Sequence, residues 1–260
     1  GPYVPALAPW LEDHAADFDV VIFFNYLYYT TWAGLPAVAG RVPTVLHPTA
    51  HDEPQFQLPL FDTMFRMPRA FAFLTEEEGV LVRRSTNVLR PSRVIGVGVD
   101  LDVPATADPG AFRSTFGLGD RPYLLFLGRV VPDKGTAELY DWFKCYKERR
   151  PGPLALVFMG EPVVPIPEHP DVVVTGFVDE AVRHDALAGA LALAQPSYFE
   201  SFSMVLTEAW SHRRPALVQG RCTVLAGQAR RSGGAIPYEG FAEFEAALDM
   251  LLDDPSIGTA

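Results

Sequence analysis

Residues 123–135 read YLLFLGRVVPDKG, and this stretch decides how the rest of the chain is interpreted. The run 123–127 has the length and the apolar, aromatic composition of a buried strand, and a helical pattern follows the stretch. The loop between them is therefore expected at the carboxyl edge of a parallel sheet, where open α/β sheets bind ligands. Arg129 and Lys134 stand on this loop, and two such cations can converge on a diphosphate. The alternative is a solvated loop with two surface cations.

Short strand patterns alternate with amphipathic stretches in both directions from this loop, as expected for βα units of the α/β class. Strands are predicted at residues 19–24, 43–47, 70–75, 94–99, 123–127, 154–159, 172–177, 191–195 and 216–219. Helices are predicted at residues 57–66, 76–84, 136–149, 180–190, 203–212, 224–231 and 241–252. This order predicts parallel sheets covered by helices.

The stretch 102–121 is rich in proline and glycine, interrupts the alternation and is predicted to be a linker between two domains. It separates an N-terminal domain, residues 1–101, from a C-terminal domain, residues 122–260. The second series of strands and helices is complete for a doubly wound domain. The first has too few strands and no early glycine-rich turn, so we expect it to be an incomplete domain.

A second candidate segment, ESFSMVLTE at residues 200–208, follows a predicted strand and opens the next helix. The free N–H groups at the start of that helix, near residues 202–204, and the helix dipole suit an anion such as a diphosphate. Glu200 precedes the helix and Glu208 lies in its second turn, and carboxylates accept hydrogen bonds from the vicinal diols of a sugar or a ribose. The alternative is a pair of ordinary acidic residues near a helix start.

Three motifs together carry a resemblance to a known family: GRVVPDKG at 128–135, ESFSMVLTEAW at 200–210 and GVGVD at 96–100. From about residue 19 to residue 252 the chain resembles the group 1, family 4-like, retaining glycosyltransferases of the GT-B fold. In that family two Rossmann-like domains face each other across a cleft, and the C-terminal one carries two glutamates separated by seven residues. Glu200 and Glu208 match this spacing.

The resemblance implies transfer of a sugar from a nucleotide sugar to an acceptor hydroxyl, with retention of configuration and with neither a metal nor a cofactor. Arg129 and Lys134 would bind the diphosphate and stabilise the charge on the leaving group in place of a divalent cation. Glu208 would bind the ribose, and Glu200 would hold the sugar near the reacting carbon. The other donor contacts implied by the resemblance are Gly160, Phe177, Val178, Ser201, Phe202, Ser203 and Met204. Phe177 and Val178 would lie near the base, and Gly160 would let the backbone approach the ligand.

The family commonly has a histidine after a strand of its N-terminal domain, near the anomeric carbon, and His47 fits that place as a candidate catalytic residue. His51 is a nearby substitute, and a single histidine at a strand end is more often structural. The family also has a glycine-rich loop near its start and a C-terminal helix that crosses back to the first domain. Neither pattern occurs in this sequence. The acceptor, whether a glycan, a lipid or a small molecule, is left open.

Two other classes remain as alternatives. One is another enzyme of the same architecture, such as a sugar-nucleotide epimerase or an α-glucan phosphorylase, of which the latter needs lysine-bound pyridoxal phosphate. The other is a non-catalytic subunit that binds sugar nucleotides, an interpretation favoured by the incomplete first domain and opposed by the motif residues Arg129, Lys134, Glu200 and Glu208.

The amino-acid composition excludes some classes of binding partner. A formal net charge of -11 and a pI near 5.0 oppose binding to nucleic acid or to anionic lipid, since both need a basic face. No stretch is apolar over the length of a membrane span, and the first residues do not resemble a signal peptide, so we expect a cytoplasmic protein. Cys145 and Cys222 are expected to be free thiols, and no histidine spacing indicates zinc.

Overall fold

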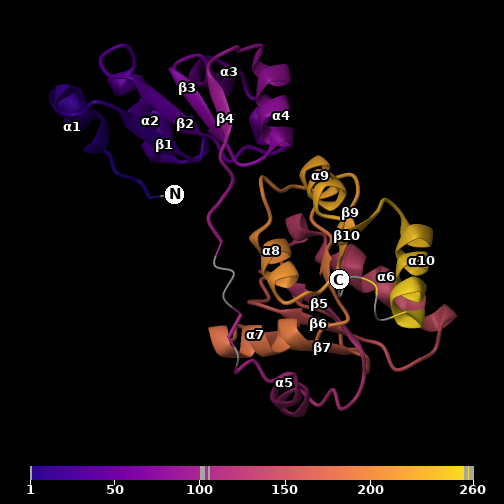
Figure 1. Cartoon of the computed structure of the whole chain (residues 1–260). Coiled ribbons are helices and arrows are strands. Elements are labelled where there is room, and N and C mark those ends of the chain that lie inside the picture. Colours follow the sequence, from indigo (N-terminus) through magenta and orange to yellow (C-terminus); the bar gives the residue numbers. More distant parts are fainter. Residues whose placement is uncertain (1, 100–102, 105, 255–256, 258–260) are drawn as a thin grey trace. The chain divides into compact units, whose positions relative to one another are not determined.

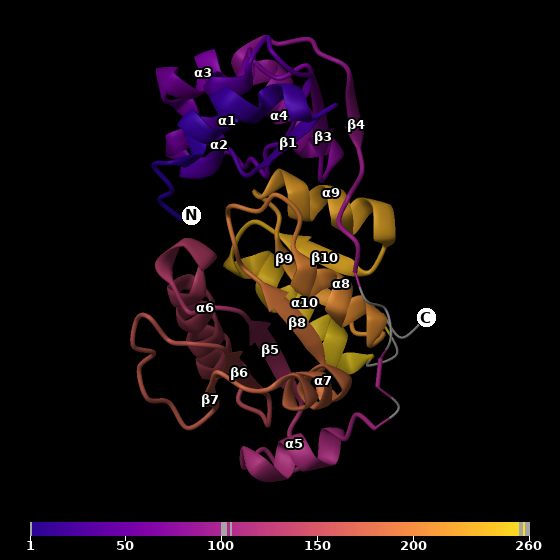
Figure 2. The same ribbon diagram turned by 90° about the vertical axis from the view of Figure 1, so that its left-hand side faces the viewer.

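The computed structural model describes residues 2–99, 103–104, 106–254 and 257. By their contacts the residues form two units, Gly1–Gly98 with Phe199–Phe202 and Val99–Tyr198 with Ser203–Ala260, each built on a parallel sheet (Figure 1 and Figure 2). The boundary after Gly98 precedes the predicted linker. Asp100 of the GVGVD run and residue 102 at the predicted start of the linker lie outside the described residues.

The sheet of the N-terminal unit follows the order of the chain. Its main elements are α1 (Leu7–His14), β1 (Val21–Phe24), α2 (Tyr29–Val38), β2 (Thr44–His47), α3 (Pro59–Phe65), β3 (Ala70–Phe73), α4 (Glu76–Thr86) and β4 (Ser92–Val94). The strands pair in parallel in the order β1-β2-β3-β4. Each crossover therefore steps in the same direction, and right-handed crossovers place α2, α3 and α4 on one face of the sheet.

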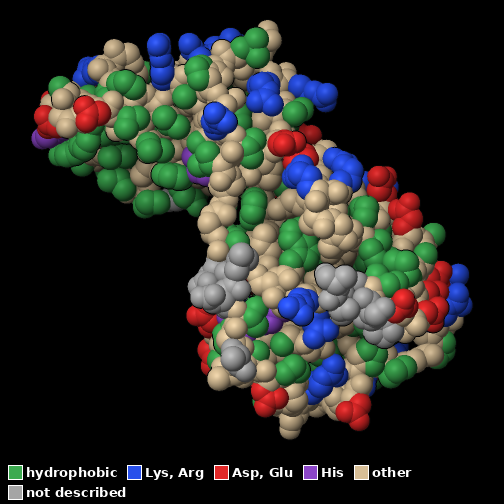
Figure 3. Space-filling model, viewed as in Figure 1, with side chains coloured by type: hydrophobic (Ala, Val, Ile, Leu, Met, Phe, Trp, Pro, Cys, Tyr) green, Lys and Arg blue, Asp and Glu red, His purple; other side chains and the backbone are tan. Residues whose placement is uncertain are grey.

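The opposite face of this sheet carries exposed apolar side chains. In β1, Phe23 is 6% exposed, whereas Ile22 and Phe24 on either side of it are 52% and 59% exposed. A Cβ at Gly34 of α2 would lie 2.9 Å from the Phe23 ring, so Phe23 is the side chain that faces the helices. Figure 3 shows hydrophobic side chains gathered on the part of this unit that Figure 1 labels α1, α2 and β1.

The C-terminal unit has a sheet whose strand order reverses. Its main elements are α5 (Pro109–Thr115), β5 (Tyr123–Leu127), α6 (Thr136–Arg149), β6 (Ala155–Met159), β7 (Val172–Gly176), α7 (Glu180–Gly189), β8 (Ala192–Gln195), α8 (Met204–Ser211), β9 (Ala216–Gln219), α9 (Thr223–Ser232), β10 (Ala235–Tyr238) and α10 (Phe241–Asp253). The parallel strands lie in the order β10-β9-β8-β5-β6-β7, so the chain moves outward from β5 to β7 and then returns to β8 on the other side of β5. This is the doubly wound order, with its switch point between β5 and β8.

Both faces of this second sheet are buried. Leu124 and Phe126 of β5 belong to one core cluster, which includes residues of α6 and α10. Tyr123 and Leu125 of the same strand belong to another, which includes residues of α5, α7, α8 and α9. All four side chains are at most 1% exposed, which explains why β5 is apolar without interruption.

Several elements differ from the sequence predictions. The strand predicted at 94–99 is wrong in position, because β4 covers Ser92–Val94 and only the N–H groups of Ile95 and Gly96 still bond to Phe73. Among the described residues, the α-helices α1, α2 and α5 and the strand β10 were not predicted. Helix α5 lies inside the predicted linker, and its Phe112 is buried against the Tyr123 ring at 5.6 Å between centroids. Strand β10 contains Pro237, which an edge strand accepts.

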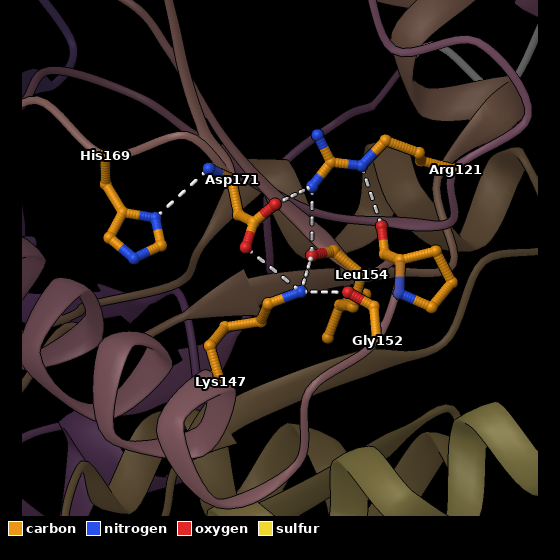
Figure 4. A network of polar contacts seen from close by, with 7 residues as sticks. Arg121, Lys147, Gly152, Leu154, His169 and Asp171 are labelled. Carbon is orange, nitrogen blue, oxygen red and sulfur yellow. Dashed lines mark hydrogen bonds and ion pairs between the residues drawn. The ribbon is translucent and has the colours of Figure 1, made fainter.

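The amino ends of β5, β6 and β7 are joined by a polar network (Figure 4). Asp171, before β7, pairs with Arg121, before β5, and with the Lys147 ammonium of α6 at 3.1 Å. Lys147 is buried and also donates to the carbonyl oxygens of Gly152 and Leu154. Burial raises the pKa of Asp171, but Lys147 and Arg121 more than offset this and hold it below its usual range. This network stabilises the amino ends of these three strands, whereas the candidate site lies at their carboxyl ends.

Candidate functional site

The loop after β5 is built by backbone contacts to the loop after β6. The Gly128 N–H donates to Met159 O at 2.9 Å, and the Val130 N–H donates to Glu161 O at 3.0 Å. Val130 is fully buried, whereas Arg129 before it is exposed. The anchored backbone therefore fixes the place from which Arg129 extends. Lys134, half-buried, ends a short 3-10 turn (Pro132–Lys134) just before α6.

Two glycines allow these loops to approach each other closely. Gly160 has a φ of +137°, and a Cβ there would lie 2.1 Å from Gly128 O. Gly135 has a φ of +68°, and a Cβ there would lie 2.3 Å from Pro196 O in the segment after β8. Gly160 was predicted to serve the approach of a ligand, but the atom that excludes a side chain is the carbonyl oxygen of Gly128.

A cavity of about 580 Å³ opens at the carboxyl ends of β5, β6 and β7. Its walls include four residues predicted as donor contacts: Arg129, Gly160, Phe177 and Val178. Phe177 is 83% exposed, so its ring is available to a ligand at the rim. The volume lies within the roughly 300–1,000 Å³ typical of small-molecule sites, and its position matches the ligand crevice of open α/β sheets.

The start of α8 has an unusual backbone. Ser203, its N-cap, has a φ of +85°, a conformation that favours glycine. Ser203 is buried, and its hydroxyl accepts a hydrogen bond from Gln195 Nε2 at 3.0 Å. The Ser203 side chain therefore makes no capping hydrogen bond to the first N–H groups of α8.

Glu208 lies one turn further along α8 and meets a residue that the sequence did not indicate. Its Oε1 accepts from Arg183 Nη1 of α7 at 3.3 Å. Glu208 and Met204 line a second cavity, of about 760 Å³, which shares Arg183 and Glu180 with the first. No local pattern could have revealed Arg183, because its role depends on how α7 packs against α8.

The remaining predicted donor residues, Glu200, Ser201 and Phe202, lie between β8 and α8 along the chain and group with the N-terminal unit by their contacts. Glu200 is half-buried. The structure therefore brings together the residues that line the two cavities of the C-terminal unit, and it assigns these three to the other unit.

His47 lies at the carboxyl end of β2 in the N-terminal unit. Its Nδ1 is 2.5 Å from Ala72 O and its ring packs edge-on against the Phe24 ring, so both contacts fix the orientation of the imidazole. The loop after His47 is held by Glu78, whose buried carboxylate accepts from the N–H groups of Ala50 at 2.7 Å and Leu74 at 2.6 Å. Burial raises the pKa of Glu78 to about 7, although these hydrogen bonds oppose the shift.

The described residues offer neither a metal site nor a membrane-spanning helix. No group of three or more His, Cys, Asp or Glu side chains among them could hold a metal ion. No helix in the described part of the chain is long and apolar enough to cross a membrane. Neither Cys145 nor Cys222 forms a disulfide within the described part of the chain.

Comparison of sequences relates the chain to sugar-transferring enzymes. Residues 121–254, more than half of the chain, match the family "Glycosyl transferases group 1". The chain is 34% identical over 205 residues to a D-inositol 3-phosphate glycosyltransferase of Kineococcus radiotolerans, covering 65% of this chain and 46% of that protein. It is 27% identical over 176 residues to the alpha-D-kanosaminyltransferase of Streptomyces kanamyceticus, covering 60% and 43%. The matches thus span less than half the length of these relatives.

Solved structures show the same fold at low sequence identity. HepE of Anabaena in complex with UDP superposes with a TM-score of 0.80 at 15% identity, covering 98% of this chain and 74% of that one. The sucrose-phosphate synthase of Thermosynechococcus elongatus gives a TM-score of 0.76 at 17% identity, covering 100% and 74%. These are GT-B proteins, and the two parallel sheets of this chain correspond to two Rossmann-like domains. The chain therefore belongs to the group 1 glycosyl transferases.

Proposed function

We propose that this chain carries the nucleotide-sugar site of a glycosyltransferase that transfers a sugar to an acceptor hydroxyl with retention of configuration. The observation that carries the proposal is the cavity at the carboxyl ends of β5, β6 and β7, lined by Arg129, Gly160 and Phe177. Two solved structures of the same fold support it, since HepE holds UDP and the E. coli trehalose-6-phosphate protein holds UDP-2-fluoro glucose. The family membership and the names of the relatives support the same chemistry.

In this proposal Arg129 and Lys134 bind the diphosphate and stabilise the negative charge that grows on it as the sugar leaves. They replace a divalent cation, so the reaction needs neither a metal nor a cofactor. Fixed donors of this kind stabilise a transition state because they need no reorganisation as the charge develops. The N–H groups at the start of α8, which the Ser203 side chain does not cap, would add to this stabilisation.

The two glutamates have different proposed roles. Glu208 accepts from the ribose hydroxyls, and Glu200 holds the sugar during the chemical step. The role of Glu200, like that of His47 beside the reacting carbon, rests on the resemblance of the sequence to the family.

The proposal is tested by titrating the chain with UDP, GDP and ADP in a calorimeter. We expect one of them to bind, Glu208→Ala to weaken its binding, and Glu200→Ala to leave binding close to that of the wild type. Binding of none of the three nucleotides to the wild-type chain would contradict the proposal, and equal affinity in Glu208→Ala would contradict the ribose role.

The chemical step is tested in the full protein by measuring transfer and donor hydrolysis. Lys134→Ala should lower turnover by roughly tenfold to a hundredfold, because a hydrogen bond to a charged group contributes ~1.5–3 kcal/mol. The anomeric configuration of the product, determined by NMR, checks retention. Loss of activity in EDTA, restored by a divalent cation, would contradict the metal-independent mechanism.

A further inference from the structure

Arg183 of α7 lies where the two cavities of the C-terminal unit meet. It lines both of them, together with Glu180 of the same helix. Its guanidinium donates through Nη1 to Glu208 Oε1 at 3.3 Å and through Nη2 to Glu180 Oε1 at 3.2 Å. One side chain thus connects the cavity lined by Arg129 and Phe177 to the carboxylate of α8.

The packing of α7 against α8 fixes the distance between the Arg183 guanidinium and the Glu208 carboxylate. His184, the next residue of α7, has its Nδ1 2.9 Å from Nε2 of His212, which directly follows α8. Burial lowers the pKa of His212 to about 4, so this ring is neutral near pH 7 and can share one hydrogen bond with His184. The Arg183 and Glu208 side chains are 32% and 22% exposed, which places their contact in partly dehydrated surroundings.

The pair is only partly satisfied within the described part of the chain. Glu208 Oε1 has the guanidinium, whereas Glu208 Oε2 is buried and has no hydrogen-bond partner there. Arg183 Nε is also buried without one. Buried polar atoms normally have partners, and a vicinal diol offers two hydroxyl donors to the two oxygens of one carboxylate.

We propose that Arg183 is a positioning residue for the ribose of the nucleotide. It holds Glu208 so that Oε2 and the remaining lone pair of Oε1 accept from the two ribose hydroxyls, while the guanidinium stays on Oε1. Without Arg183 the carboxylate turns freely and its geometry toward the diol is lost. The inference rests on the proposed function, because it takes Glu208 as the residue that binds the ribose.

The experiment compares ligands that differ in the hydroxyl concerned. Whichever of UDP, GDP and ADP binds the wild-type chain most tightly is titrated alongside its 2′-deoxy counterpart and inorganic pyrophosphate. The variants are Arg183→Met, which keeps the apolar stem of the side chain, and Arg183→Lys, which keeps the charge without the planar fork. Arg149→Ala is the matched control, because Arg149 pairs with Glu245 on the surface between α6 and α10.

We expect Arg183→Met to bind the ribonucleotide about tenfold more weakly, as for the loss of one charge-assisted contact. Its preference for the ribonucleotide over the 2′-deoxy form should fall toward one, whereas its affinity for pyrophosphate should stay within about twofold of the wild type. Arg183→Lys should lie between the two proteins, and Arg149→Ala should match the wild type.

Some results would overturn this inference, and another would contradict the proposed function. An unchanged ribose preference in Arg183→Met overturns the inference, as does tighter nucleotide binding, which would mean that Arg183 competes with the ribose. An equal loss for all three ligands overturns it as well, because it indicates general damage to the fold. If Arg183→Met does not fold, Arg183→Lys must show the reduced preference. Wild-type protein that binds no nucleoside diphosphate contradicts the proposed function itself.

Discussion

The two sheets of this protein are both parallel, yet they differ in strand order. In the N-terminal unit the order β1-β2-β3-β4 follows the chain, and the face of the sheet that carries Ile22 and Phe24 is exposed. In the C-terminal unit the order reverses between β5 and β8, and both faces are buried. A reversal sends the loops on its two sides in opposite directions and leaves a crevice between them. The candidate site lies at the carboxyl ends of this second sheet, where the loops after β5, β6 and β7 line one cavity and α7 and α8 line the other.

The difference also appears in the glycines at the strand ends. A Cβ at Gly160, after β6, would clash with the backbone of the neighbouring loop. A Cβ at Gly96, after β4 in the N-terminal unit, would have no heavy atom of the described residues within 4 Å. Both have a positive φ, so a side chain is strained at either position, but only Gly160 is also crowded. Tight loop packing is thus found between the loops that follow β5 and β6.

The largest effect is expected for Gly160→Ala, which should destabilise the C-terminal unit by ~3 kcal/mol or more through crowding and backbone strain. Gly96→Ala, its control, should cost the N-terminal unit only ~1–2 kcal/mol. The measurement is urea unfolding followed by tryptophan fluorescence, with Trp10 and Trp32 replaced by Phe for the first variant and Trp142 and Trp210 replaced by Phe for the second. If Gly160→Ala and Gly96→Ala lowered the free energy of unfolding by similar amounts, the crowding at Gly160 would not distinguish the two units.

The next largest effect concerns two lysines of α6. Lys147→Ala should destabilise the C-terminal unit by ~2–4 kcal/mol, because it removes the buried ammonium that pairs with Asp171 and donates to the carbonyl oxygens of Gly152 and Leu154. Lys144→Ala removes only an exposed pair with Glu148 at 4.0 Å and should cost less than ~1 kcal/mol. Equal midpoints of urea unfolding for the two variants would show that the network contributes nothing to stability.

The two units should also respond to pH with opposite sign. Folded Glu78 has a pKa of about 7, whereas in the unfolded chain it ionises near pH 4.5. The free energy of unfolding of the N-terminal unit should therefore fall as the pH rises from 4.5 to 7. The expected fall is ~1–3 kcal/mol. Asp171 has a lowered pKa, so its contribution to the C-terminal unit is present above about 3.8 and is lost as pH falls further.

The matched variants for these pH effects are Glu78→Gln and Asp171→Asn. Each should remove the pH dependence assigned to its own unit and leave that of the other unit in place. If the free energy of unfolding of Glu78→Gln fell between pH 4.5 and pH 7 as steeply as that of the wild type, another group would be responsible for the pH dependence.

The smallest effect is expected on the exposed face of the first sheet. Ile22→Ser should change the free energy of unfolding by less than ~1 kcal/mol, because the side chain already contacts water. Leu124→Ala in the second sheet should cost ~2–5 kcal/mol, because Leu124 is fully buried. Urea unfolding of both variants checks the contrast, and a large cost for Ile22→Ser would mean that this face is covered in solution.

The sequence predicts the parts of the fold that local patterns determine. The apolar run of β5 and the helix starting at Thr136 lie where predicted, because both depend on neighbouring residues. Helix α5 was missed because Pro109 and Gly110 resemble a loop, although Asp108 caps the helix by accepting from the N–H groups of Gly110 and Ala111. Strand β10 was missed because Pro237 is tolerated only at an edge, and edges are set by the whole sheet.

The candidate site was predictable to a similar extent. Arg129, Gly160 and Phe177 were predicted as donor contacts and do line one cavity. Arg183 could not be predicted, since its contact with Glu208 spans two helices whose packing no sequence period records. The reason given for Gly160 was also incomplete, because the approach of two backbones is a tertiary property.

The strand order has a further consequence for how the protein is made. Strands β1, β2 and β3 each pair with the next strand along the chain, so the sheet they form with β4 can assemble as the polypeptide leaves the ribosome. Strand β5 pairs first with β6, but its other edge must wait for β8, where Leu124 meets Ala192. Until then the apolar edge of β5 is open to wrong partners. A nascent chain stalled between these strands would have Arg129 and Lys134 but no Glu208, so the proposed nucleotide site would be completed only after α8 has been made.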